Sequence, residues 1–352
     1  MGRTAIVAIN VMLGALVSAM SARSAVGEDA AAVDAIVAHV TIAEVAAAPN
    51  EIAAPLTSAD VAVSAVNAAG PSSSSANVSR IVSLVPSVTE TLFALGIGAR
   101  VVGVSTDSDF PAAAAALPEV GTFGAPVAEA IAALTPDLVL TSPSPGNHSA
   151  VSALQRAGVR VVVVGGDGGI QDVTDGILDV ARATGEETRG KELVARIDAE
   201  LVSVRRGVAG LDRPAVAVAV GREPLILAGP SSYLGELITV AGGSNIAGAV
   251  GGRWPRVGLE FLVQQRPEVI LDLSVAMERA AEPAAAGGQA EALERWANLG
   301  PIPAVASRRV YGADRKSAAV LLRPGPRLAE AARLLAARLH PGIFPSAMEN
   351  MK

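Results

Sequence analysis

Apolar runs of strand type alternate with helical patterns from about residue 80 to residue 339. The runs are short, rich in Val, Ile and Leu, and closed by Gly, Ser or Pro, which is typical of strands buried in parallel sheets. They occupy residues 81–84, 101–104, 137–140, 159–164, 215–220, 269–273 and 309–311. The alternation predicts an α/β fold in which helices cover both faces of the sheets.

A long charged segment divides this alternation into two halves. Residues 186–208 show no strand signal, and apolar side chains recur there at helical spacing at Leu193, Ile197, Leu201 and Val204. We therefore predict one long helix between two lobes. The predicted limits are 80–185 for the N-terminal lobe, 186–210 for the inter-lobe helix, 211–342 for the C-terminal lobe and 343–352 for a tail.

The N-terminal part of the sequence follows a different pattern. A basic start leads into the apolar residues 4–17 and then into small residues, so that residues 1–25 have the layout of a secretory signal peptide. An uncleaved anchor is the alternative, because residues 5–22 approach the length that spans a bilayer. Residues 26–79, rich in Ala, Ser and Val, are predicted to form a tether. These features predict an exported, periplasmic protein.

The composition argues against several classes of function. The chain has 28 basic and 34 acidic residues and a net charge of -6, which provides no basic surface for nucleic acid. It contains no cysteine, so disulfides, thiolate metal sites, a cysteine nucleophile and a lipid-modified N-terminal cysteine are all ruled out for this sequence. Its hydrophobic fraction of 51% over 352 residues is enough for two cores.

Candidate catalytic and metal-binding residues are few. The three histidines, His39, His148 and His340, are scattered, and no G-x-S-x-G, H-E-x-x-H or Walker A sequence occurs. His340 is expected to bond to the C-terminal carbonyl groups of the last helix. His148 follows a predicted strand, where open α/β sheets bind ligands, and is a possible metal ligand. The glycine-rich residues 165–169 lack nucleotide-binding spacing and are predicted to form a turn. The sequence favours a binding protein without a resident metal or cofactor.

The two halves share a repeated unit. Residues 127–140 and 258–271 both contain a glutamate, a short helical stretch and, seven residues after the glutamate, a proline followed by an acid and a buried strand. The glutamates are Glu129 and Glu260, each in the first turn of its predicted helix, where the exposed N–H groups favour a carboxylate. Each glutamate could be only a helix cap. As a pair, they predict two equivalent anions suited to docking on a symmetric, basic partner.

Aromatic residues occupy equivalent places before these glutamates. Phe123 and Trp254 each lie six residues before the glutamate of their half, in glycine-rich loops. Trp254 is predicted to have no apolar neighbours to pack on, and an aromatic ring on a loop suits a large planar ligand. We predict that the two rings face each other across a cleft, with core packing as the alternative for Phe123. Trp296 lies at helical spacing with apolar residues and is predicted to be core.

A set of motifs resembles a known family, the periplasmic substrate-binding proteins of ABC transporters for cobalamin, iron-siderophores and haem. The resemblance extends from Arg80 to about Leu339 and is closest to the cobalamin-binding members. Its motifs are residues 80–96, 102–105, 108–111, 241–246 and 254–257, together with both glutamate repeats.

The resemblance implies a fold, a partner and roles for the glutamates. The fold would be that of a class III periplasmic binding protein, with two Rossmann-like lobes joined by one rigid helix. Glu129 and Glu260 would pair with arginines of the permease dimer in the inner membrane, and the protein would act as a monomer. Closure of the lobes on a ligand is hypothesised to set the spacing of the two glutamates.

The resemblance also narrows the ligand to a corrinoid such as cobalamin or a related metal chelate. Phe123 stands where such proteins typically have a tryptophan, and Asp107 where aromatic residues are frequent, so haem and ferric siderophores stay open as alternatives. His148 and Tyr233 are the candidate axial ligands for haem, and Arg222, Arg253 and Arg315 are candidates for an anionic siderophore. The residues predicted to bind ligand are Phe123, Trp254, Asp107, Ser144, Asn147, Arg222 and Arg253.

Two alternatives come from other classes. An exported tetrapyrrole-modifying enzyme, such as a chelatase, would need a histidine and a carboxylate that converge on one point, and only His148 is a candidate for that histidine. A structural or adhesive surface protein, tethered by an uncleaved N-terminus, would have a filled cleft.

Overall fold

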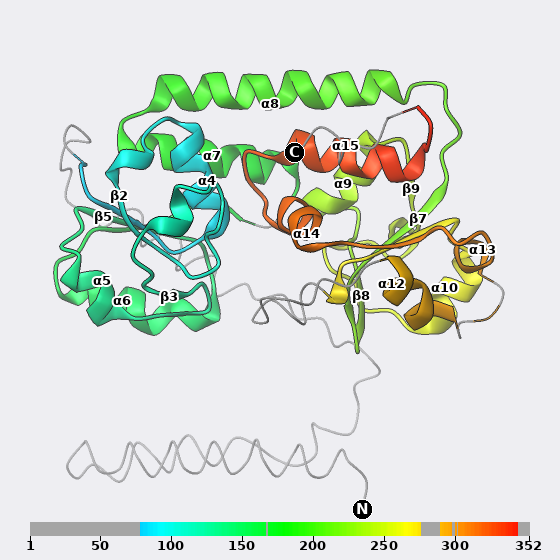
Figure 1. Ribbon diagram of the computed structural model, residues 1–352, viewed down its shortest axis with the longest axis horizontal. Helices are drawn as coiled ribbons and strands as arrows, with labels where there is room; N and C mark the ends of the chain where they lie inside the picture. The colour runs from blue at the N-terminus through cyan, green and yellow to red at the C-terminus, as the bar shows by residue number, and fades with distance from the viewer. Residues whose placement is uncertain (1–77, 167, 276–288, 298–299, 301, 344–352) are drawn as a thin grey trace, which may run out of the picture. The chain divides into compact units, whose positions relative to one another are not determined.

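The computed structural model describes residues 78–166, 168–275, 289–297, 300 and 302–343 (Figure 1). The predicted signal peptide, the tether as far as residue 77 and the tail beyond residue 343 lie outside the described residues, as does His39. Within the described ranges, no helix combines the length and the apolar character needed to cross a membrane.

The N-terminal lobe contains a four-stranded sheet in the order β2-β1-β5-β6, and all its neighbouring strands are parallel. The strands are β1 (Ile81–Ser83), β2 (Val101–Val104), β5 (Leu138–Thr141) and β6 (Val161–Val163). The helices are α4 (Pro86–Ala94), α5 (Ala128–Ala133), α6 (His148–Arg156) and α7 (Ile170–Thr184). A small antiparallel hairpin, β3 (Gly121–Thr122) and β4 (Ala125–Pro126), lies between β2 and α5. The four predicted strands of this lobe are therefore present.

The C-terminal lobe contains a sheet in the order β11-β10-β7-β8, with β9 also paired to β7. Its strands are β7 (Ala215–Arg222), β8 (Leu225–Leu227), β9 (Ser244–Asn245), β10 (Val269–Asp272) and β11 (Val310–Gly312). Its helices are α9 (Tyr233–Val240), α10 (Leu259–Gln265), α12 (Gln289–Trp296), α13 (Pro303–Ala306), α14 (Arg315–Leu322) and α15 (Leu328–Leu339). β7, β10 and β11 are parallel, as predicted, and β8 adds an antiparallel strand beside β7 at the edge of the sheet. A tight turn at Glu223 and Pro224 reverses the chain and leaves no room for a crossover helix.

The two lobes are joined by α8 (Glu187–Gly207), which is drawn in green along the top of Figure 1. Its buried side carries Leu193, Ile197, Leu201 and Val204, the four apolar positions whose spacing predicted the helix. α8 packs against α7 of the N-terminal lobe and α15 of the C-terminal lobe. The helix thus forms part of the core of both lobes.

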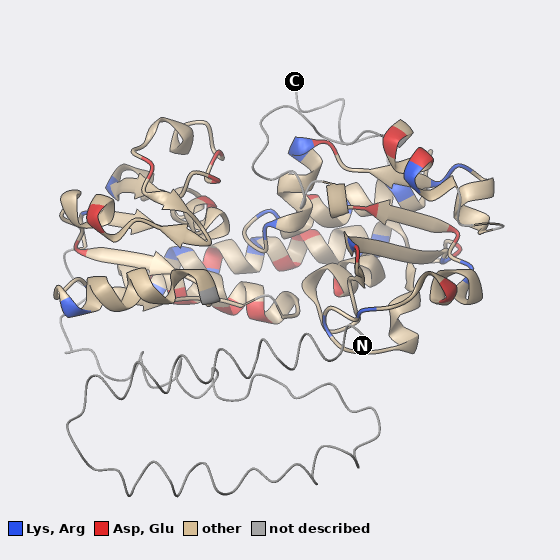
Figure 2. Cartoon of the chain, turned by 90° about the horizontal axis from the view of Figure 1, so that it is seen from below, with Lys and Arg blue, Asp and Glu red and all other residues tan. Residues whose placement is uncertain are grey.

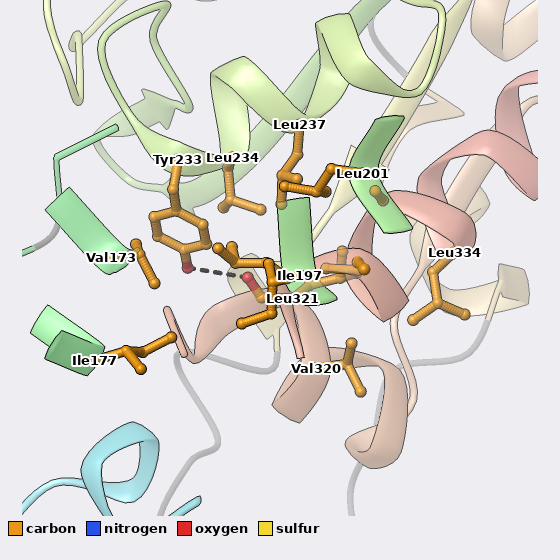
Figure 3. Close-up of a cluster of buried hydrophobic side chains, with 14 of the residues drawn as sticks. Val173, Ile177, Ile197, Leu201, Tyr233, Leu234, Leu237, Val320, Leu321 and Leu334 are labelled. Carbon is orange, nitrogen blue, oxygen red and sulfur yellow. Dashed lines mark hydrogen bonds between the residues drawn. The ribbon is translucent and has the colours of Figure 1, made fainter. Parts of the chain in front are cut away.

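One apolar core contains side chains from both lobes and from α8. Figure 3 shows Val173 and Ile177 of α7 in the same cluster as residues of α9, α14 and α15. In that cluster the hydroxyl of Tyr233 donates a hydrogen bond to the carbonyl oxygen of Leu321 at 2.9 Å. Because burial of this apolar surface is a main source of folding free energy, the two lobes stabilise one another.

The repeated unit has the same backbone turn in both lobes, and in both its acid accepts hydrogen bonds at the start of a strand. Thr135 and Arg266, at equivalent positions before the proline, have positive φ angles of 46° and 49°. Asp137 accepts hydrogen bonds through one carboxylate oxygen from the backbone N–H groups just before β1. Glu268, its equivalent, accepts one from the backbone N–H of Ala215 at the start of β7. The acid after each proline therefore fixes the start of the first strand of its lobe.

The hydrogen bonds to Asp137 make one contribution to stability depend on pH. Bonds from the backbone and side chain of Ser79, and from Arg80, lower the pKa of Asp137 below its ordinary value of 3.8. This contribution is complete above pH 3.8 and is lost as the pH falls toward the folded-state pKa, because the unfolded chain takes up the proton first. We expect Asp137→Asn to flatten the acid limb of the stability curve below this pH, as measured by urea unfolding. Asp212→Asn, at an exposed aspartate before β7, is the control and should keep the wild-type slope.

Candidate functional site

Three of the predicted ligand residues of the N-terminal lobe lie on neighbouring loops after the parallel strands. Asp107 follows β2, and its carboxylate lies 3.5 Å from the backbone nitrogen of Phe123, which occupies the turn of the β3–β4 hairpin. A Cβ added at Gly146 would clash with the carbonyl oxygen of Gly124, so the loop after β5, which contains Ser144, packs directly on this hairpin. The carboxyl ends of parallel strands are the usual ligand-binding edge of such sheets.

The loop after β5 is held by its own side chains. Asn147 is 4% exposed, and its amide NH₂ donates hydrogen bonds of 2.9 Å to the Oγ1 of Thr141 and the carbonyl oxygen of Ser142. This amide shapes the loop, and a direct contact of Asn147 with ligand stays a prediction. Ser144 is half-buried, and His148 is exposed as the first residue of α6.

Trp254 has more apolar support than its sequence indicated. Its ring packs edge-on against Tyr233, with ring centroids 6.3 Å apart and an interplanar angle of 75°, and it contacts the main core. The expectation that Trp254 has no apolar neighbours was therefore wrong, because the chain brings α9 next to its loop. Tyr233 is 4% exposed and its hydroxyl is bonded to Leu321, which places it in the core rather than at a free axial position. Arg253, next to Trp254, is exposed, and its carbonyl accepts a hydrogen bond from Gly229.

Arg222, at the end of β7, lies beside the core tryptophan. Its guanidinium is stacked over the ring of Trp296 at 5.1 Å from the centroid and donates a hydrogen bond to the carbonyl oxygen of Arg295. The Nη1 atom of Arg222 is buried and has no hydrogen-bond partner. Trp296 is fully buried, as predicted. Arg222 therefore belongs to a packed site near α12, with one polar atom unsatisfied.

The two repeat glutamates are both exposed. Glu129 lies in the first turn of α5 and Glu260 in the first turn of α10, and no ion pair of the described residues involves either carboxylate. Leu259, next to Glu260, and Val263, three residues after it, are 43% and 46% exposed. We call Glu129 and Glu260 the docking glutamates.

A buried group of charges that the sequence analysis missed connects the lobes. We call Glu90, Asp109, Arg323 and Arg327 the inter-lobe ion cluster. The side chain of Glu90, on α4, is 1% exposed, while those of Arg323 and Arg327, between α14 and α15, are 16% and 13% exposed. The nearest sequence signal was the motif at residues 108–111, which includes Asp109 but gives no indication of its partners more than 200 residues away.

Two carboxylates at this cluster have shifted pKa values. Burial by itself raises the pKa of Asp109, but the hydrogen bond and charge of Arg323, together with the charge of Arg315, hold it below its ordinary value. Burial raises the pKa of Glu330, on α15, above its ordinary value; the charge of Glu90 adds to this rise, while the charge of Arg327 opposes it. The arginines thus favour the charged form of Asp109.

The last histidine, His340, has a structural partner in the neighbouring helix α9. His340 bonds through its ring to the carbonyl oxygen of Ala241 at the end of α9, so the expected bond to its own helix was wrong. The ring turns toward α9 because α9 and α15 pack side by side. In the part of the chain that the structure describes, no group of three His, Asp or Glu side chains could hold a metal ion.

Two parallel-stranded lobes that share a repeated unit and are joined by one helix define a two-lobed binding-protein fold. The chain belongs to the Periplasmic binding protein family, which it matches over residues 81–316. The family and fold class expected from the sequence are confirmed.

The relatives are substrate-binding proteins. The chain is 29% identical over 271 residues, 75% of this chain and 81% of the relative, to an uncharacterized ABC transporter substrate-binding lipoprotein of Bacillus subtilis. It is 25% identical over 200 residues to the vitamin B12-binding protein of Vibrio parahaemolyticus, covering 57% of this chain and 72% of that one. A solved periplasmic heme-binding protein in complex with two hemes shares 31% identity with a TM-score of 0.62, covering 75% of this chain and 98% of that one.

Proposed function

We propose that this chain captures a macrocyclic metal chelate outside the cytoplasm and delivers it to an ABC importer. The observation that carries the proposal is the family match over both lobes, combined with one exposed glutamate at the equivalent place in each lobe. The protein acts as a monomer without catalysis or a resident cofactor, and its partner is a permease dimer in the membrane. Figure 2 shows acidic and basic positions interspersed over the described residues, which gives no reason to add a nucleic-acid partner.

The ligand is a corrinoid or a haem, which share a large, nearly planar ring around a metal. Relatives of both kinds support this class, through the vitamin B12-binding and heme-binding proteins. Phe123 and Trp254 are half-buried aromatic residues on loops, and such rings bind planar ligands by stacking. The exposed His148 favours haem as the second candidate, because imidazole is a frequent iron ligand.

A parallel titration tests the ligand class. The full chain is titrated with cyanocobalamin, haemin and a ferric siderophore, and tryptophan fluorescence and visible absorbance are recorded. Because Trp296 is fully buried, we expect quenching to report mainly on Trp254. Saturable quenching by cyanocobalamin is expected, and Trp254→Ala should weaken binding roughly tenfold or more. A Soret shift with haemin that His148→Ala abolishes would assign the ligand to haem.

Controls separate a ligand contact from a packing role for Trp254. Trp254→Phe keeps an aromatic ring against Tyr233 and should retain more affinity than Trp254→Ala. Val202→Ser, at an exposed position on α8, should bind like wild type. Saturation by the siderophore alone, or by none of the three, would contradict a tetrapyrrole-type ligand and leave only the family and fold.

A further inference from the structure

The two lobes share a carboxylate that is almost fully removed from water. Arg327 binds Glu90 with two parallel hydrogen bonds, one of them 2.7 Å from Nε to Oε2, and Arg323 Nη1 lies 3.3 Å from Oε1. Glu90 belongs to the N-terminal lobe, whereas both arginines belong to the C-terminal lobe. A two-pronged arginine–carboxylate pair has a narrow range of good geometries, so it fixes orientation as well as distance.

Arg323 extends this contact to the predicted ligand loops. Its Nη1 donates to Asp109 Oδ1 at 2.6 Å, and its Nη2 donates to the carbonyl oxygen of Asp107 at 2.9 Å. The same loop is bonded to the β3–β4 hairpin, since the backbone N–H of Thr106 donates to the carbonyl oxygen of Gly121 at 2.9 Å. The guanidinium of Arg323, in the C-terminal lobe, therefore holds the Asp107 loop of the N-terminal lobe. The hairpin that carries Phe123 is bonded to the same loop.

A second junction of the lobes lies at the start of α7. The backbone N–H of Tyr233 donates to the carbonyl oxygen of Gly168 at 2.6 Å, and the N–H of Ile170 donates to Glu236 Oε2 at 2.9 Å. The glycine-rich residues 165–169, which lack nucleotide-binding spacing, thus contribute Gly168 to this junction. Moving the lobes apart would break both junctions and leave Glu90 without its cations, which is strongly unfavourable for a buried carboxylate.

We propose that the inter-lobe ion cluster fixes the spacing of the docking glutamates before any ligand binds, and that Arg323 is a positioning residue for the Asp107 loop. The importance of this spacing for docking rests on the proposed function, while the role of the inter-lobe ion cluster in holding the lobes together does not. In this proposal the lobes do not close on a ligand, as hypothesised from the sequence, because their relative position is fixed in the empty protein. Ligand capture then depends on the Asp107 loop and its neighbours. Docking depends on the distance between the two docking glutamates, which is the same in the empty protein.

Spin-label distances in the unliganded chain test this directly. The chain contains no cysteine, so Ala133→Cys on α5 and Gln264→Cys on α10, exposed and equivalent in the repeat, give two defined labels near the docking glutamates. We expect one narrow distance distribution that cyanocobalamin or haemin leaves unchanged. Glu90→Gln and Arg323→Gln should each broaden it or add a longer component.

Arg333→Gln is the matched control. Arg333 also lies on α15 and forms an ion pair, with Glu200 of α8, but both side chains are partly exposed. Its loss should leave the distance distribution as in wild type. A broad distribution in the wild type, or a distribution that neither Glu90→Gln nor Arg323→Gln alters, would show that the inter-lobe ion cluster does not fix the spacing of the docking glutamates.

Hydrogen exchange tests the positioning role separately from folding. In Arg323→Gln, the backbone amides of residues 106–110 should exchange roughly tenfold faster, whereas those of β5 should keep their wild-type rates. Equal rates at residues 106–110 would show that Arg323 does not position the loop, and faster exchange in β5 as well would show a general loss of stability instead. Because the comparisons between wild type and the variants are made without ligand, failure of the titration leaves both results interpretable.

Discussion

Uptake of the ligand should fall to background when both docking glutamates are reversed in charge, by Glu129→Lys together with Glu260→Lys. Both carboxylates are exposed in first helical turns, and no ion pair of the described residues uses them, so the change should not disturb the fold. If they meet basic groups of the permease, each reversal replaces an attraction with a repulsion. Like charges at an interface cost several kcal/mol, so docking should weaken by roughly 100-fold or more.

The measurement compares uptake by cells of the native host with affinity in the purified protein. The ligand is the one that saturates in the titration, and its affinity should be unchanged in the double variant. The matched control is Glu187→Lys with Glu192→Lys, two exposed glutamates on α8, which changes the net charge by the same amount. Intact uptake in the docking variant would remove the docking role, and equal loss in the α8 control would point to net charge instead.

Most of the fold was predictable because its signals are local. Buried parallel strands form short apolar runs, and helical spacing marked the buried face of α8, so both could be located without tertiary information. The repeat could be recognised because its proline and acid stand at fixed distances from the glutamate. The structure adds the reason for that spacing, since Asp137 and Glu268 fix the first strands of their lobes.

The parts that were missed depend on which distant segments meet. Glu90 looked like one more polar residue on a helix, and its pairing with Arg323 and Arg327 is set by contacts between lobes rather than by spacing. Trp254 was predicted to lack apolar support for the same reason, because Tyr233 comes next to it only after folding. β9 has only two residues, which is too short for a hydrophobic period to identify.

Replacing the core tryptophan by Trp296→Phe should destabilise the chain by about 3 kcal/mol, because it combines a lost hydrogen bond with a cavity. Trp296 is fully buried, and its Nε1 donates to Asp272 Oδ2 at 2.7 Å. Asp272 is 1% exposed, and its other oxygen accepts hydrogen bonds from the backbone and hydroxyl of Ser274. Phenylalanine would leave Oδ2 buried without the indole N–H and would remove the larger ring beneath Arg222.

Urea unfolding at neutral pH measures this loss, and Trp254→Phe is the matched control. Trp254 is half-buried, and phenylalanine preserves a ring against Tyr233, so its cost should stay below about 1 kcal/mol. The contrast follows from position: Asp272 ends β10 at the ligand-binding edge of the sheet, yet both its oxygens are bonded within the lobe. Equal costs for the two tryptophan variants would mean that the bond from Trp296 to Asp272 does not support this lobe. A larger cost for Trp296→Phe would show that the buried ring of Trp296 and its bond to Asp272 stabilise this lobe.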